Sequence, residues 1–182
     1  MKTAKAFIFE YGIRGWNMDE FAKEVGITKR TLYKYMNSKE SLIEAALVDY
    51  IKETQKELAD QLNHTADFNS GIHIILHIFP ELVTKMQSKI IKDIYKHYPS
   101  IEKTIFQKRE EFSYEIIKFI QKGKTLGIVR TEIKDMAIVE AVQAFILYYA
   151  KNNPDTLSIK LRESIDLLLN GIIQGDKNNV NV

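Results

Sequence analysis

The sequence predicts an all-α fold of about nine helices. Only three prolines and eight glycines interrupt the 182 residues. No stretch alternates cleanly between apolar and polar residues, as a half-buried strand would. Apolar residues instead recur at the spacing i, i+3, i+4, i+7, which gathers them on one face of an α-helix.

The first predicted helix carries its apolar side chains at Ala4, Phe7, Ile8 and Tyr11. Gly12 follows directly and is placed to end this helix, because glycine adopts the left-handed conformation of a helix C-terminus without strain.

Two short helices follow. Asn17 is a predicted N-cap with Glu20 three residues later, the spacing of a capping box. Gly26 breaks the chain, and Thr28 is the N-cap of a third helix that extends to about Met36. Three short helices with a tight turn before the third match a helix-turn-helix.

A longer helix begins at Lys39, after the N-cap Ser38, and keeps an apolar stripe for about 24 residues. The polar stretch NHTADFNSG is predicted to be a loop. Pro80 should kink or break its helix, because its ring would clash with the carbonyl of Leu76. Further helices are predicted over residues 70–86, 89–97, 100–124, 135–152 and 157–174.

Composition narrows the class of protein. The chain is 45% hydrophobic and 27% charged with a net charge of +2, as is ordinary for a soluble globular protein. No run reaches the roughly 18 apolar residues of a membrane span, and Glu10 argues against a signal peptide. The absence of cysteine excludes disulfides and thiolate zinc sites. We therefore expect a cytoplasmic protein that does not contact membranes.

The third helix has an unusual charge pattern. At about 100° per residue, Leu32 and Met36 share one face and Arg30 and Lys34 the opposite one, as in a recognition helix that enters the major groove of DNA. A basic solvated helix of an ordinary bundle is the alternative. Between Thr28 and Lys39 the chain carries four cations and no acid, namely Lys29, Arg30, Lys34 and Lys39.

The stretch FIFEYG, followed by NMDEFAKEVGITKRTLYKYMNSKESL, resembles the N-terminal domain of the tetracycline-repressor (TetR) family of bacterial regulators. Trp16 departs from the family pattern, which usually has Thr, and Met36 replaces the usual Phe. The resemblance implies a backbone contact to DNA at Asn17 and Met18. It implies further DNA contacts at Thr28, Lys29, Thr31, Tyr33, Lys34, Tyr35 and Lys39, to which the helix geometry adds Arg30.

We expect residues 1–46 to form the helix-turn-helix DNA-binding domain. A long helix would join it to a helical ligand-binding and dimerisation domain, residues 47–182. The segments 136–150 and 157–173 are apolar on more than one face, which favours burial against a second copy. Core helices of a monomer are the alternative. The candidate dimer residues are Val142, Phe145, Ile146, Tyr149, Leu161, Ile165, Leu168 and Ile172.

Aromatic and polar side chains are frequent between His73 and Tyr149, a mixture that suits an apolar pocket with a few orienting polar groups. They can equally be plain core. The candidate pocket residues are His73, His77, Tyr95, Tyr98, Phe106, Tyr114, Phe145 and Tyr148, and Phe79, His97 and Phe112 belong to the same mixture.

No motif indicates an enzyme or a cofactor, since the sequence has no nucleophile elbow, no glycine-rich phosphate loop and no carboxylate pair at a persuasive spacing. Arg109, Glu110 and Glu111 are interpreted as the exposed side of a long helix. Together with the apolar segments 136–150 and 157–173, the resemblance to the TetR family implies a repressor that binds a pseudo-palindromic operator in double-stranded DNA as a homodimer and is released by an unidentified small-molecule inducer. The alternatives are a protein-interaction module with a basic docking helix, and a metal sensor or helical metalloenzyme using His73 and His77.

Overall fold

The computed structural model describes residues 1–65, 67–84, 86 and 88–173, and within these ranges the secondary structure is helical. The only β pairing in them is an isolated bridge between Val129 and Ile173. The helices are α1 (Lys2–Tyr11), α2 (Met18–Glu24), α3 (Lys29–Tyr35), α4 (Lys39–Asn63), α5 (Phe68–His73), the π-helical η1 (Ile74–Ile78), α6 (Phe79–Thr84), α7 (Ser88–His97), α8 (Pro99–Thr125), α9 (Asp135–Asn152), the 3-10 helix η2 (Pro154–Thr156) and α10 (Leu157–Ile172). Because α5, η1 and α6 follow one another without a break, the described chain confirms the prediction of about nine helices.

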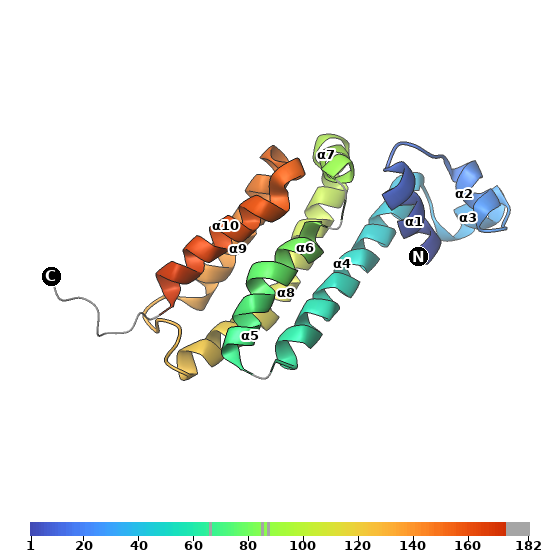
Figure 1. Ribbon diagram of the computed structural model, residues 1–182. Helices are drawn as coiled ribbons and strands as arrows, with labels where there is room; N and C mark the ends of the chain where they lie inside the picture. Colours follow the sequence, from blue (N-terminus) through green and yellow to red (C-terminus); the bar gives the residue numbers. More distant parts are fainter. Residues whose placement is uncertain (66, 85, 87, 174–182) are drawn as a thin grey trace, which may run out of the picture.

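The long helix α4 connects two groups of helices (Figure 1). Helices α1, α2 and α3 lie at its N-terminal end, and α1 packs against it. Helices α5 to α10 form a bundle along the rest of it, in which α8 packs on α4, α9 on α8, and α10 on both α9 and α6. A single helix therefore runs from the N-terminal group into the bundle.

Side-chain caps set the starts of the first helices after α1. Asn17 and Glu20 form the predicted capping box at α2, and the Thr28 hydroxyl accepts a hydrogen bond from the Thr31 N–H at α3. Ser38 caps α4 and forms a reciprocal pair of hydrogen bonds with Ser41. Each cap satisfies backbone donors that a helix N-terminus leaves without partners.

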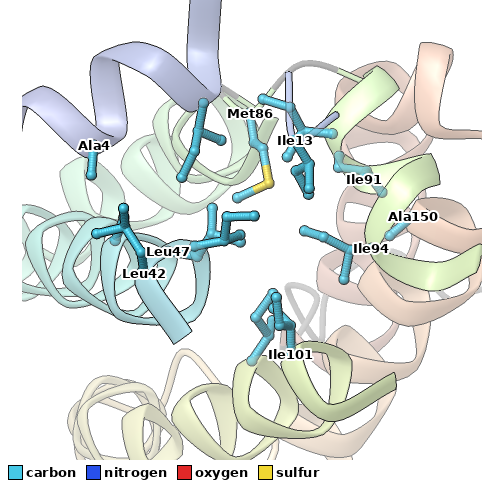
Figure 2. Close-up of a cluster of buried hydrophobic side chains, with 14 of the residues drawn as sticks. Ala4, Ile13, Leu42, Leu47, Met86, Ile91, Ile94, Ile101 and Ala150 are labelled. Carbon is cyan, nitrogen blue, oxygen red and sulfur yellow. The ribbon is translucent and has the colours of Figure 1, made fainter. Parts of the chain in front are cut away.

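One hydrophobic cluster extends through both groups of helices. It contains Ile13 and Phe21 of the N-terminal group, Leu47 of α4, and Ile94 and Leu161 of the bundle. Figure 2 shows Ile13, Leu47, Met86 and Ile94 pointing into this cluster. The N-terminal group is therefore packed onto the bundle as well as joined to it by α4.

A second cluster fills the far end of the bundle, around Phe68 and Phe119, whose rings stack with centroids 4.5 Å apart. Gly71 and Gly123 let these rings approach. A Cβ at Gly123 would lie 2.4 Å from Phe68 Cζ and 2.6 Å from Val129 Cγ2. The second cluster therefore has no room for a methyl group at this position.

The helix around Pro80 does not break as one of the two predicted outcomes has it, but it changes its winding before the proline. The turn Ile74–Ile78 is π-helical, and the Phe79 N–H bonds to the Ile74 carbonyl five residues earlier. The wider turn removes the α-helical arrangement in which the proline ring would meet the carbonyl of Leu76. This helix begins at Phe68, two residues earlier than predicted, because Asp67 caps it through the Ser70 N–H. The predicted end of the last helix, at Gln174, lies outside the described residues.

Candidate functional site

Helix α3 has an inner and an outer face, as the spacing of its residues predicts. Leu32 is buried in the cluster that holds Phe21, with Met36 and Val25 half-buried beside it. Arg30, Thr31, Tyr33, Lys34 and Tyr35 are exposed, Tyr35 to 72%. Helix α3 thus exposes two cations, a threonine and two tyrosines to solvent, while its opposite, apolar face packs against the core.

The N-terminal turn of α3 is held by two hydroxyl groups. Thr28 Oγ1 accepts from the Thr31 N–H at 3.1 Å, and the two hydroxyl oxygens lie 2.9 Å apart. One of these hydroxyls donates to the other, so one hydroxyl hydrogen remains for an external acceptor. The predicted DNA contacts at Thr28 and Thr31 therefore share a single free donor.

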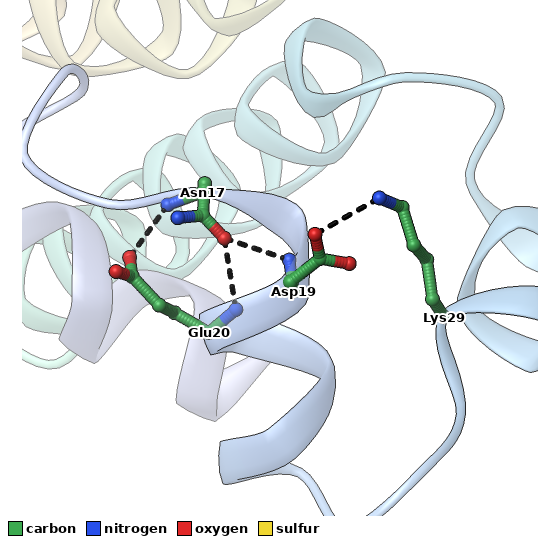
Figure 3. A network of polar contacts seen from close by, with 4 residues as sticks. All are labelled: Asn17, Asp19, Glu20 and Lys29. Atoms are coloured by element: carbon green, nitrogen blue, oxygen red, sulfur yellow. Dashed lines mark hydrogen bonds and ion pairs between the residues drawn. The ribbon is translucent and has the colours of Figure 1, made fainter.

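Lys29 links α3 to α2. Its ammonium lies 2.9 Å from Asp19 Oδ2 (Figure 3), and this hydrogen bond raises the pKa of Lys29. Both side chains are more than half exposed, so the pair is solvent-screened. The Lys29 ammonium is therefore already paired with a carboxylate in the protein without DNA.

The two residues that begin α2 have different environments. The Asn17 side chain accepts from the backbone N–H groups of Asp19 and Glu20 at 2.9 and 3.0 Å, and the Asn17 N–H donates to Glu20 (Figure 3). The Met18 side chain is buried. A DNA contact at Met18 would therefore come from its backbone, and one at Asn17 from the amide NH2 group that the cap leaves over.

Trp16 holds the side chain of Lys39, an arrangement that sequence reasoning missed. The indole is buried, and its Nε1–H donates to the Gly12 carbonyl at 2.9 Å. The Lys39 ammonium lies over the indole ring and donates to the Trp16 carbonyl. Lys39 is half-buried, unlike Arg30 and Lys34. An aromatic residue in place of the family's Thr was the signal for this cation–π contact.

A cavity of about 150 Å³ lies inside the bundle. Its walls come from α4, η1, α6, α7, α8, α9 and α10, with apolar residues such as Ile94, Ile105 and Phe112. Polar side chains also line it, namely Tyr50, Thr54, Gln55, Tyr95, Glu102, Arg109, Ser113 and Gln143. The mixture fits a site for an organic molecule of mainly apolar character.

Of the eight candidate pocket residues, only Tyr95 lines this cavity, together with Phe79 and Phe112 of the wider set. Tyr114 and Tyr148 are 64% and 59% exposed. The interpretation of Arg109 as an exposed residue is wrong: Arg109 is half-buried and lines the cavity, whereas Glu110 and Glu111 are exposed. The seven candidates that do not line the cavity are His73, His77, Tyr98, Phe106, Tyr114, Phe145 and Tyr148.

His73 and His77 lie on neighbouring turns with ring centroids 4.6 Å apart, and both are exposed. Across the described residues, no group of three or more histidine, aspartate or glutamate side chains is arranged to hold a metal ion. The histidine pair thus has no third protein ligand in this part of the chain.

The candidate dimer residues divide by burial. Ile146, Leu161, Ile165 and Ile172 are buried within the single chain, so their assignment to an intermolecular surface is wrong. The reason is that α9 and α10 pack on each other and use these side chains as core. Val142, Phe145, Tyr149 and Leu168 are half-buried against the same clusters.

These features define an all-α helix-turn-helix protein with a cavity-bearing helical bundle. None of the helices in the described ranges is long and apolar enough to cross a membrane. Residues 1–46 match the model of the bacterial regulatory proteins of the tetR family, and the resemblance of the chain to the TetR family is confirmed.

Solved structures share the fold over nearly the whole chain. A TetR-family transcriptional regulator from Pectobacterium atrosepticum is 16% identical, with a TM-score of 0.75 over 97% of this chain and 93% of that one. The fatty acid degradation regulator FadR from Bacillus halodurans is 16% identical, with a TM-score of 0.66 over 94% and 96%. A TetR/AcrR-family regulator from Thermobifida fusca YX-ER1 is 17% identical, with a TM-score of 0.65 over 93% and 94%. No curated protein sequence matches the chain.

Proposed function

We propose that the protein is a transcriptional regulator that binds operator DNA as a homodimer and releases it when a small molecule occupies the bundle cavity. The observation that carries this proposal is the division of α3 into a buried apolar face and an exposed face with Arg30 and Lys34. A recognition helix needs both faces, because one anchors it and the other enters the major groove.

The exposed side chains of α3 have the chemistry that DNA recognition requires. Arg30 and Lys34 can donate to guanine acceptors or phosphates, and the Tyr33 hydroxyl can donate to phosphate. Lys29 can exchange its exposed pair with Asp19 for a phosphate at little cost. Residues 1–46 are thus proposed as the DNA-binding domain.

A homodimer would place two copies of α3 about 34 to 36 Å apart, in successive major grooves of a pseudo-palindromic site. We propose a set of interface residues on α9 and α10 that differs from the one predicted from the sequence. Large apolar side chains are exposed there at Met136, Tyr148, Ile159 and Leu167. Pairing α9 and α10 with their symmetry mates would bury this surface in a four-helix interface.

The cavity lies where occupancy can act on the N-terminal group. Its wall includes Ile51 and Leu58 of α4, the helix that continues to the N-terminal group. Met86 and Ile94 line the cavity and belong to the same cluster as Ile13. A ligand that displaces α4 or α7 would move α3, and ligand and DNA would then oppose each other's binding by typically about 1 to 3 kcal/mol.

Fluorescence anisotropy with duplexes tiling the region upstream of the gene, repeated over a salt series, tests the proposal. We expect selective binding of two chains per site with a steep salt slope, since each neutralised phosphate contributes about −0.9. Arg30→Ala with Lys34→Ala should abolish selectivity, while the exposed bundle cations Lys56 and Lys103, changed to Ala, serve as the matched control.

Unchanged affinity of the Arg30→Ala, Lys34→Ala variant would contradict the assignment of α3. A shallow salt slope without a preferred duplex would instead indicate that the basic helix docks on protein. Metal analysis of untagged protein checks the histidine pair separately, and stoichiometric metal at His73 and His77 would favour a metal sensor.

A further inference from the structure

Arg109 is the one arginine in the wall of the bundle cavity. It lies on the inner face of α8, in a series of cavity-lining residues that includes Glu102, Ile105, Ser113 and Ile116. Their spacing of three or four residues puts them in one row along the helix. Because Arg109 belongs to this row, its side chain is half-buried beside apolar groups.

The positive charge of Arg109 has no partner among the residues that the structure describes. Two acids on the same helix pair with lysines instead: Glu111 lies 2.5 Å from the Lys108 ammonium, and Glu102 lies 3.9 Å from that of Lys151. A partly buried charge is costly unless an opposite charge and hydrogen bonds compensate it. Arg109 is therefore suited to receive an anion from outside the chain.

A second donor lies one helical turn from Arg109. The Ser113 hydroxyl oxygen accepts from Gln143 Nε2 at 2.8 Å, and its own hydrogen is left to donate. Gln55 Nε2 donates to the Lys108 carbonyl at 2.7 Å and fixes α4 to α8 next to this position. The guanidinium and the Ser113 hydroxyl thus form a small polar subsite in a fixed part of the bundle.

The rest of the cavity is suited to hydrocarbon. The other side chains that line it are mostly aliphatic or aromatic, among them Ile91, Ile94, Phe112, Val139 and Ile146. A guanidinium binds a carboxylate through two parallel hydrogen bonds, and an apolar wall favours an alkyl chain.

We propose that the cavity binds an aliphatic carboxylate, with the carboxylate on Arg109 and Ser113 and the alkyl chain among the apolar side chains. This inference deepens the proposed function and rests on the cavity as its effector site. It makes Arg109 the residue that selects an anionic head group over a neutral one.

Isothermal titration of the protein without DNA tests the inference, with decanoate and decan-1-ol as probes. We expect decanoate to bind more tightly than the alcohol. Arg109→Gln keeps one amide donor but loses the charge and the second of the two parallel hydrogen bonds. It should therefore weaken decanoate binding roughly 10- to 100-fold and leave binding of the alcohol unchanged. Arg109→Lys should retain part of the preference. Lys103→Gln removes an exposed cation from the same helix and is the matched control.

Equal binding of decanoate and the alcohol would overturn the inference, as would decanoate binding that Arg109→Gln does not change. Circular dichroism of Arg109→Gln excludes misfolding as the cause of a loss. Anisotropy with DNA separates the two proposals. Decanoate binding through Arg109 in a protein that binds no DNA would support this site and contradict the regulator, whereas selective DNA binding without decanoate binding would overturn this site alone.

Discussion

The Lys39 ammonium lies 4.3 Å from the centroid of the Trp16 indole ring and donates a hydrogen bond to the Trp16 carbonyl. Burial lowers the pKa of Lys39, against a smaller opposite effect of the Glu20 carboxylate. Lys39, a predicted DNA contact, thus links the start of α4 to the segment before α2.

This contact predicts a difference between Lys39 and Lys34 in DNA binding. Lys34→Gln should reduce the salt slope by about 0.9, because an exposed cation that neutralises one phosphate is lost. Lys39→Gln should change the slope far less and lower the thermal stability instead. Anisotropy over a salt series and thermal unfolding measure the two effects. Equal loss of slope in both variants would show that Lys39 leaves Trp16 to reach the DNA.

Gly123→Ala should destabilise the bundle by about 1 to 3 kcal/mol, because the new methyl group would overlap Phe68 and Val129. Urea unfolding gives the free energy. Gly171→Ala is the matched control on α10, where a Cβ meets nothing within 4 Å. That change should leave stability unchanged or raise it by up to about 1 kcal/mol, through better helix propensity. Equal stability of Gly123→Ala and the unmodified protein would contradict the packing at Phe68.

Acid should weaken the link between α8 and α9. The Lys124 ammonium lies 2.6 Å from Asp135 Oδ1 and its hydrogen bond lowers the pKa of Asp135; burial opposes this shift, and a hydrogen bond from Gln121 adds to it. A carboxyl group whose pKa is lowered in the folded state stabilises the fold at pH values above its ordinary pKa. This stabilisation is lost as the pH falls through the lowered pKa.

Asp135→Asn should therefore cost up to about 1 kcal/mol near pH 7, a small value because the pair is partly solvated. The difference from the unmodified protein should shrink as the pH falls below the ordinary pKa of aspartate, and it should vanish once Asp135 is protonated in the folded protein. Urea unfolding over a pH series measures it. A difference that stays constant with pH would contradict the ion pair.

Leu167→Glu should dissociate the proposed homodimer. Leu167 is 74% exposed on α10, and burial of a leucine is worth about 1.5 to 3 kcal/mol at each of the two symmetry-related positions. The dissociation constant should thus rise by roughly 100-fold or more. Sedimentation equilibrium measures it, with Leu126→Glu as the control at an exposed leucine outside α9 and α10. A Leu167→Glu variant as dimeric as the control would exclude this surface.

Local features could be predicted from the sequence. The caps at Asn17, Thr28 and Ser38, and the inward face of α3 at Leu32, follow from residues a few positions apart. An irregularity near Pro80 was equally predictable, because the clash involves one ring and one neighbouring carbonyl, although its form, a π-helical turn, was not. These features need no knowledge of how the helices are arranged.

Features that depend on distant parts of the chain were missed. Arg109 stands next to two glutamates and looks like part of a solvated face, but the placement of α4 and α9 turns it toward the cavity. Leu161 and Ile165 are apolar, as residues of a dimer interface would be. They are nevertheless buried within the single chain, where α10 packs on α9. Periodicity identifies an apolar face without saying which partner buries it.

The shared hydrophobic cluster has a consequence for modularity. Ile13 is fully buried in one cluster with Leu47, Ile90 and Ile101, which all lie outside residues 1–46. Residues 1–46 on their own would therefore expose apolar side chains to water. A proposed boundary after residue 46 would separate roles rather than autonomous folding units. Helices α1 to α3 would then unfold cooperatively with the bundle. Fusing them to another effector domain would require the contacts of Ile13 to be rebuilt.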